Sequence, residues 1–146
     1  MTVAAGVAAE LPFLRAEAEA LMVDTFTAYS PNGVTVVDGL EVQGYASEGQ
    51  ASGKVQGGSS STKDTATEYV TVGGVSRPLL RGGLHLPLGA PVPVAGDRGI
   101  GWEYACTAVG PNSDPSLVGR RYLVHSVPAK SFATARRLDV VEVPAP

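Results

Sequence analysis

The spacing of apolar side chains changes once along this chain of 146 residues. Over residues 10–22 the spacing is helical, and one face carries the apolar side chains of Leu11, Leu14, Ala18, Leu21 and Met22. From residue 23 onward the apolar positions alternate, as they do in strands that bury one face. The pattern therefore predicts an N-terminal arm at 1–9, a helix at 10–22 and a strand-rich body at 23–143.

Turn-forming residues divide the strand-rich body into short segments. Residues 30–33 (SPNG) and 38–39 (DG) are strong turn signals. Proline cannot donate to a strand ladder, so Pro78, Pro87 and the prolines that follow predict edge strands or kinked crossings. The expected strands are 23–29, 34–37, 40–46, 51–56, 68–72, 101–109, 120–127 and 137–143. One helix followed by seven or eight short strands, without βαβ alternation, predicts a single mainly β domain, a small antiparallel β-barrel or sandwich.

Residues 57–67 (GGSSSTKDTAT) contain no side chain that could anchor a hydrophobic core. They predict a long flexible loop between two strands. Long loops often carry function, and the alternative is an ordinary surface loop.

Charge is distributed unevenly, although the net charge is only −3. Residues 1–70 carry three basic and nine acidic side chains, whereas residues 71–146 carry eight basic and five acidic ones. This division suits a head-to-tail contact between identical copies, and an uneven scatter by chance is the alternative. The small net charge gives no case for general nucleic-acid affinity.

Targeting signals are not recognisable in the sequence. No stretch reaches the roughly 20 apolar residues of a membrane-spanning helix. The first fifteen residues lack the positive region of a signal peptide, because their first charge is Glu10. Cytoplasmic synthesis without a membrane partner is therefore expected.

The one cysteine limits the chemistry that the chain can carry. Cys106 has no second thiol, so an internal disulfide is excluded, and His85 and His125 are too few to complete a four-ligand zinc site. Cys106 alternates with Trp102 and Tyr104 on an apolar strand face, so the core is its expected place.

No catalytic constellation is recognisable either. His85 and His125 lie among apolar neighbours, and a structural role is favoured for both, although pairing with Asp97 or Asp139 stays open. Carboxylates are dispersed, and the glycine-rich stretch lacks the spacing of a phosphate loop. A protein without enzymatic activity, metal or cofactor is the expectation.

The last third of the chain carries motifs that resemble a known family. The order LPL, APVPVAGD, DPSLVGRRYLVHSV and SFATARRLDVVEV is similar to the small head-to-tail stopper or adaptor proteins of actinobacteriophages. Near the N-terminus, a helix ending AEALMVDTFTA leads straight into the first strand, as in that family. The resemblance is strongest over 84–143 and 14–29 and weakest over 40–75. Two departures are the short first hairpin at 30–38 and the absence of any shared motif in 57–67.

The resemblance implies a structural virion protein at the head–tail junction of a tailed phage. Such a protein forms a ring below the portal or adaptor ring, retains the packaged DNA without sequence-specific contact and offers a surface to the tail terminator. A head–tail adaptor or a tail terminator of the same neck is the alternative. Adaptors are more often helical, so the strand-rich pattern favours the stopper.

Three groups of residues acquire roles under this hypothesis. A channel or gating loop is expected at Gly57, Gly58, Ser59, Ser60, Ser61, Thr62, Lys63, Asp64 and Thr65. Charged side chains are expected at subunit contacts, with a solvated basic rim as the alternative for the arginines; these are Glu17, Asp24, Arg120, Arg121, Arg136 and Arg137. A structural turn is expected at Asp114, Pro115 and Gly119, with Leu117 and Val118 as its anchors in the core.

Two other classes of function stay open. A ligand- or carbohydrate-binding barrel would need a concave pocket lined by Trp102, Tyr104 and Tyr122. A small hydrolase would need His125 and an aspartate in contact.

Overall fold

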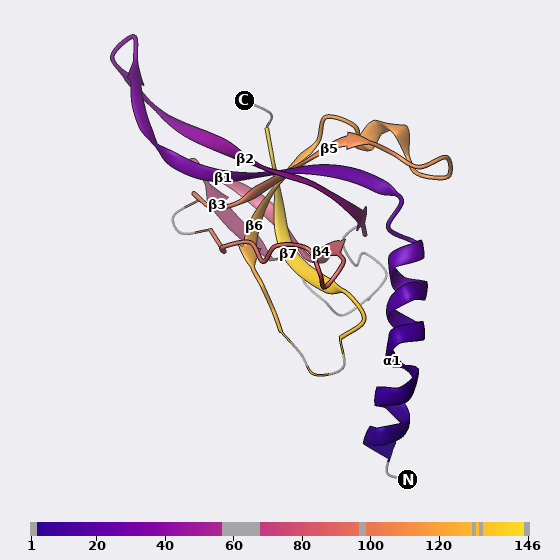
Figure 1. The fold of residues 1–146 in the computed structure, drawn as a ribbon. Helices are drawn as coiled ribbons and strands as arrows, with labels where there is room; N and C mark the ends of the chain where they lie inside the picture. The colour runs from indigo at the N-terminus through magenta and orange to yellow at the C-terminus, as the bar shows by residue number, and fades with distance from the viewer. Residues whose placement is uncertain (1–2, 57–67, 97–98, 130, 132, 145–146) are drawn as a thin grey trace.

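Six antiparallel strands close into a barrel in the computed structural model, which describes residues 3–56, 68–96, 99–129, 131 and 133–144 (Figure 1). The elements of these residues are α1 (Val3–Ala20), β1 (Asp24–Val37), β2 (Leu40–Val55), β3 (Tyr69–Val72), β4 (Val75–Leu86), β5 (Glu103–Ala108), the 3-10 helix η1 (Pro115–Leu117), β6 (Arg121–Ser126) and β7 (Arg136–Val143). The strand order is β2-β1-β5-β6-β7-β4-β3, and an additional pairing of β2 with β4 closes the ring. The predicted fold class, mainly β with one α-helix, is confirmed. The expected gating loop lies outside the described residues.

The seam that closes the barrel is the shortest of the described ladders. It joins only residues 54–55 of β2 to residues 84–85 of β4. One further bond continues it, in which the Gln56 amide donates to the Gly83 carbonyl oxygen at 2.8 Å. Leu84 lies in this seam and is fully buried, so the barrel closes over an apolar side chain.

Alternating side chains from the six barrel strands fill its interior. In β1 the pattern is clear from Asp24 to Ala28, where every second residue is buried. The central cluster consists of Phe26, Ala28, Leu84, Leu86, Tyr104, Cys106, Tyr122, Val124, Leu138 and Val140. The predicted core position of Cys106 beside Tyr104 is correct.

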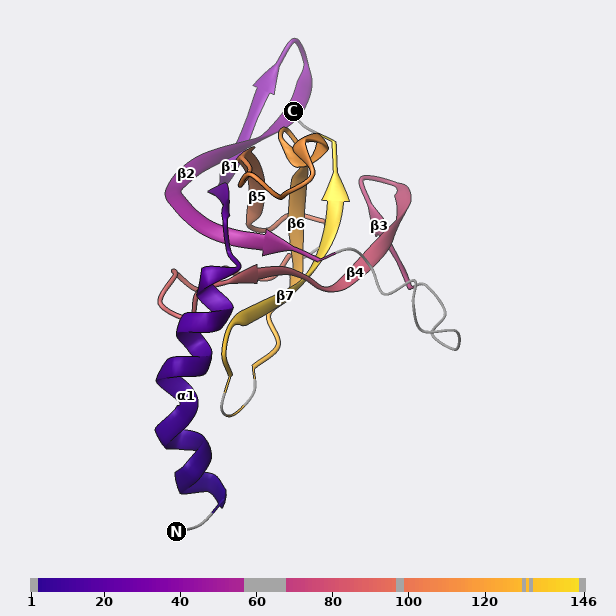
Figure 2. The same cartoon turned by 90° about the vertical axis from the view of Figure 1, so that its right-hand side faces the viewer.

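Two arms project from opposite ends of the barrel, as both views show (Figures 1 and 2). One is α1. The other is the distal part of the β1–β2 hairpin, because β5 pairs with β1 only from Thr25 to Tyr29. Beyond that point the two strands pair with each other alone, as far as Val37 and Leu40.

The helix begins earlier and ends sooner than the apolar pattern predicts. Residues 3–9, expected as an arm, are helical because alanine is the best helix former even where no amphipathic pattern exists. Pro12 consequently lies inside the helix instead of in its first turn. Among the expected apolar face, Leu11 and Met22 are buried, whereas Leu14 and Leu21 are exposed. The apolar residues of this face are therefore covered only in part.

The predicted turn at 30–33 is wrong, since β1 runs straight through it. The pairing of β1 with β2 shifts between Pro31 and Gly33, which is a β-bulge, and Gly33 has φ 110°. Gly49, with φ 100°, similarly interrupts β2 without ending it, so the two strands expected at 40–46 and 51–56 are one. The same residue types serve turns and bulges, which is why the pattern misleads. The expected turn at 38–39 is present, with positive φ at Asp38 and at Gly39.

Pro78 lies in a strand with neighbours on both sides, so the expectation of an edge strand is wrong there. β4 pairs with β3 and with β7. The β7 ladder begins at Leu79, one residue after the proline, so the missing amide breaks no bond of that ladder. Residues 87, 91 and 93 lie outside the strands.

Candidate functional site

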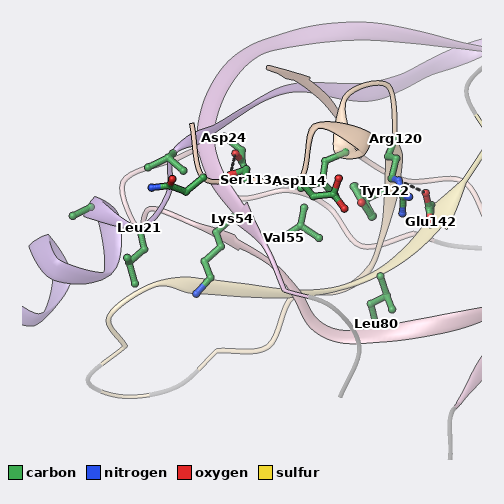
Figure 3. Close-up of a pocket in the computed structure, with 14 residues that line it drawn as sticks. Leu21, Asp24, Lys54, Val55, Leu80, Ser113, Asp114, Arg120, Tyr122 and Glu142 are labelled. Atoms are coloured by element: carbon green, nitrogen blue, oxygen red, sulfur yellow. Dashed lines mark hydrogen bonds and ion pairs between the residues drawn. The ribbon is translucent and has the colours of Figure 1, made fainter. Parts of the chain in front are cut away.

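The largest described cavity opens beside the end of α1, where β1, β2 and the segment before β6 meet (Figure 3). Its volume is about 770 Å³. Most of the wall is apolar, and Lys54 extends from β2 beside it (Figure 3). The lining residues include Leu21, Val23, Val55, Leu80, Leu117 and Tyr122.

The acidic groups of this cavity are occupied by bonds within the chain. The Asp24 carboxylate accepts from the Gly110 amide at 2.9 Å and from the Ser113 hydroxyl at 2.6 Å. Glu142 faces Arg120, with 3.6 Å between Oε1 and Nε. Among the described residues no group of three or more His, Cys, Asp or Glu side chains could hold a metal ion. The carboxylates of Asp24 and Glu142 therefore serve contacts within the fold.

The segment 114–119 forms the wall of this cavity as a capped turn. Asp114 accepts from the Ser116 amide at 2.9 Å, and the hydrogen bonds from Ser116 lower the pKa of its carboxyl group. Pro115 begins η1, and Gly119 reverses the chain with φ 91°. Leu117 packs against the core. Val118, expected as a second anchor, is half exposed, so that part of the prediction is wrong.

The six charged residues expected at subunit contacts divide into two sets. Glu17, Arg120 and Arg137 are exposed and Arg136 is half-buried, so these four remain available to a neighbour. Asp24 and Arg121 are only 4% and 6% exposed and bond within the chain. Their assignment to a contact surface is wrong, because other parts of the same chain cover and bond both side chains.

Arg121 forms a buried ion pair on the outer face of β6, opposite to the face on which Tyr122 and Val124 enter the core. Its Nε donates at 2.5 Å to the carboxylate of Glu103, which lies diagonally across the ladder on β5. The guanidinium carbon is 4.4 Å from the ring centre of Tyr29 and 5.1 Å from that of Tyr45. Both rings therefore shield the pair with cation–π contacts, which makes it part of the barrel wall.

The histidines are not assembled with carboxylates. His85 is half-buried on β4, and burial followed by the charge of Arg137 lowers the pKa of its imidazole. His125 is exposed on β6. Asp139 already accepts from the Gly82 amide at 2.8 Å and from the Ser126 hydroxyl at 2.6 Å, and Asp97 lies outside the described residues. The placement of His125 and Asp139 gives a hydrolase no support.

The aromatic side chains expected in a ligand pocket lie in different surroundings. Tyr104 and Tyr122 are 2% exposed and belong to the core cluster, against which half-buried Trp102 packs. Of the three, Tyr122 alone lines the cavity of Figure 3. This arrangement provides no aromatic platform for a sugar ring.

Burial of tyrosine side chains predicts a pH limit to the fold. Burial, helped by Glu103 and opposed by Arg121, raises the pKa of Tyr45 to about 12, and burial raises that of Tyr104 equally. A phenol whose pKa is raised in the folded state stabilises the fold fully below its unfolded value of 10.0. This contribution is lost as the pH rises to about 12.

The free energy of unfolding is therefore expected to fall between pH 10 and pH 12. Urea unfolding at several pH values, together with phenolate absorbance, checks this, and Tyr45→Phe should reduce the fall. Full phenolate formation by pH 10 in folded protein would contradict the prediction.

A second concavity lies at the far end of the barrel from the hairpin, between β7 and the connection from β6. Its volume is about 280 Å³. Arg136 and Arg137 add positive charge to this concavity, and Asp139 adds a carboxylate. The remaining lining residues are apolar or small: Gly82, Leu88, Pro128, Ala129, Ala133 and Ala135. We call it the arginine groove. The sequence indicates its two arginines, but not the small residues that hollow it.

The distal hairpin exposes aliphatic side chains on both faces, which the alternating pattern leaves unidentified. Thr35 lies opposite Val42 and Val37 opposite Leu40, so these four share one face, which we call the hairpin face. Leu40 is 71% exposed. On the other face Val36 is 70% exposed. The sequence does indicate these exposed side chains. The segments TVV and LEV on either side of the DG turn contain more apolar residues than a hairpin in water needs.

Among the residues that the structure describes, no helix combines the length and apolar character needed to cross a membrane.

Taken together, the fold and these surfaces define a small antiparallel β-barrel protein with two projecting arms. The chain belongs to a family of unknown function, DUF6093, whose model matches residues 14–141. Neither the curated proteins nor the solved structures compared with the chain include a significant match.

Proposed function

We propose that the chain is the head-to-tail stopper of a tailed bacteriophage, a subunit of a ring between the portal or adaptor and the tail. The observation that carries the proposal is a rigid barrel with uncovered apolar side chains on arms at its two ends (Figures 1 and 2). The resemblance of residues 84–143 and 14–29 to stopper and adaptor proteins supports it.

The barrel supplies the wall of the ring in this proposal. Its strands close on themselves, which leaves few free edges and makes the wall stiff. No chemistry is required of such a wall, and the bonded state of Asp24, Asp139 and Glu103 agrees with that. Retention of DNA is then a mechanical task of the ring.

The two arms supply contacts to neighbours. Phe13 on α1 and Leu21 directly after its end are each 61% exposed, and Leu40 at the hairpin tip is exposed further. Monomeric proteins seldom keep such groups of apolar side chains in water, so partners on both sides fit the arrangement. A ring subunit placed between a head-side and a tail-side ring meets partners in this way.

Imaging intact particles by cryo-electron microscopy tests the proposal. The expected result is a ring of this chain at the head–tail junction, and particles made without it should be filled heads that lose DNA or lack tails. A neck accounted for entirely by other proteins, or no association with particles, would overturn the proposal. The position of the ring separates the stopper from the adaptor, next to the portal, and from the terminator, next to the tail.

A further inference from the structure

The hairpin tip carries both acidic and apolar side chains and no positively charged ones. No lysine or arginine occurs between Arg15 and Lys54, so the distal part of the hairpin carries only the acidic residues Asp38, Glu41 and Glu48 as charged groups. Glu41 lies opposite Val36, on the other face of the hairpin from Leu40, and both residues are next to the turn. A two-stranded hairpin is only marginally stable in water, so packing against another surface would stabilise this one.

The arginine groove has the complementary chemistry. Arg136 donates from Nη2 to the Leu88 carbonyl oxygen at 3.3 Å, while its Nε is buried and has no hydrogen-bond partner among the described residues. Arg137 is exposed at the rim. Asp139 brings one negative charge to the groove against the two positive charges of the arginines, so it neutralises them incompletely.

The size of the groove fits an aliphatic side chain. An apolar cavity of roughly 150 Å³ can take up a benzene ring. The arginine groove, at about 280 Å³, therefore has room for the Leu40 side chain with part of its backbone. Ala129 is exposed at the edge of the groove, and the Ala133 carbonyl oxygen accepts from Arg15 Nε at 3.1 Å, so α1 borders the groove.

Within one molecule the hairpin tip and the arginine groove lie too far apart to contact each other. The hairpin projects from one end of the barrel, and the connection between β6 and β7 extends from the other, on the side of α1 (Figures 1 and 2). Complementary surfaces at opposite ends are the arrangement that joins copies head to tail.

We propose that the hairpin tip of one copy docks in the arginine groove of the next, with Leu40 in the cavity and Asp38 and Glu41 facing Arg136 and Arg137. The contact is heterologous, so repeated copies form a closed ring or an open helix according to the rotation between them. The inference deepens the proposed function and rests on it for the ring, but the pairwise contact can be measured alone.

Cysteine cross-linking of the purified full chain tests the docking. Leu40→Cys and Ala129→Cys are combined in a Cys106→Ala background, which removes the native thiol. Oxidation is expected to give dimers, trimers and longer covalent products, because every copy carries both thiols. Each single-cysteine variant can give only dimers, and a double variant that yields no more than these would overturn the docking.

Charge reversal identifies the contacting groups. Glu41→Arg alone and Arg137→Glu alone should each slow cross-linking about tenfold, and the two together should restore most of the rate. Glu48→Arg is the matched control, because it makes the same change in β2 near the barrel and should leave the rate unchanged. All three side chains are exposed, so circular dichroism should show folded variants. Equal slowing by Glu48→Arg, or no rescue in the double variant, would contradict the assignment.

The two proposals fail separately. Covalent chains in solution without density at the neck would leave the docking intact and overturn the stopper. If the chain is found at the neck, the same cysteine pair is oxidised in particles that carry the variant. A ring whose subunits stay unlinked there would overturn the docking and leave the stopper standing.

Discussion

Replacing Glu103 by alanine is expected to lower the free energy of unfolding by about 3–5 kcal/mol. The variant leaves the Arg121 guanidinium in the barrel wall, where it is 6% exposed, without its carboxylate partner. Tyr29 and Tyr45 still face the cation, but ring faces replace only a small part of a charged hydrogen bond. Urea unfolding followed by circular dichroism measures the change.

A matched surface pair separates burial from pairing as the cause. Arg81 and Glu68 are 2.6 Å apart, but their side chains are 59% and 54% exposed. Glu68→Ala should therefore cost about 1 kcal/mol or less. The combined substitution Glu103→Leu with Arg121→Met should recover most of the stability, because it removes both charges and keeps the volume. A loss below about 1 kcal/mol for Glu103→Ala would refute the role given to the pair.

Leu84→Ala should lower the free energy of unfolding by about 2–5 kcal/mol. Leu84 is fully buried and lies in the two-residue ladder between β2 and β4 that closes the barrel. Truncation leaves a cavity at the place where few backbone hydrogen bonds hold the wall together. Thermal or urea unfolding of the variant checks the value.

Leu40→Ala provides the control for this substitution. It makes the same chemical change at a side chain that is 71% exposed, so the free energy of unfolding should change by about 0.5 kcal/mol or less. The proposed docking predicts that this variant instead weakens association between copies. If Leu40→Ala destabilises the chain as much as Leu84→Ala does, the hairpin is part of the folding core and not a free arm.

The sequence predicted the mainly β fold correctly but several strand ends wrongly. Alternation located the core face of β5, where Tyr104 and Cys106 are buried. It could not do so for β6 and β7, because each of them buries four consecutive residues. Gly33 and Gly49 led to the wrong prediction that β1 and β2 are each divided in two. Glycine with positive φ occurs in bulges as well as in turns. Whether a strand continues past such a residue depends on its partner across the ladder, which lies far along the chain.

Charged residues at surfaces were harder to predict than the core. Arg120 and Arg121 are adjacent and chemically identical, yet one is exposed and the other is 6% exposed beside Glu103. Arg120 precedes β6 and lies in solvent, whereas Arg121 is covered by Glu103 and two tyrosine rings from other strands, which no local pattern indicates. The capped turn at Asp114 was predictable because its hydrogen bonds are local.

The hairpin has no joint between its tip and the barrel, since β1 and β2 each run unbroken from wall to turn. The hairpin is a two-stranded arm whose hydrogen-bonded ladder continues into the barrel wall. The bulge at Gly33 bends the arm and so sets its direction relative to the barrel. A neighbour held at the tip would thus be held at a set orientation to the wall. Deleting the extra residue of that bulge would keep the pairing of the distal strands but remove the local bend and twist, so the tip would present the neighbour at another angle.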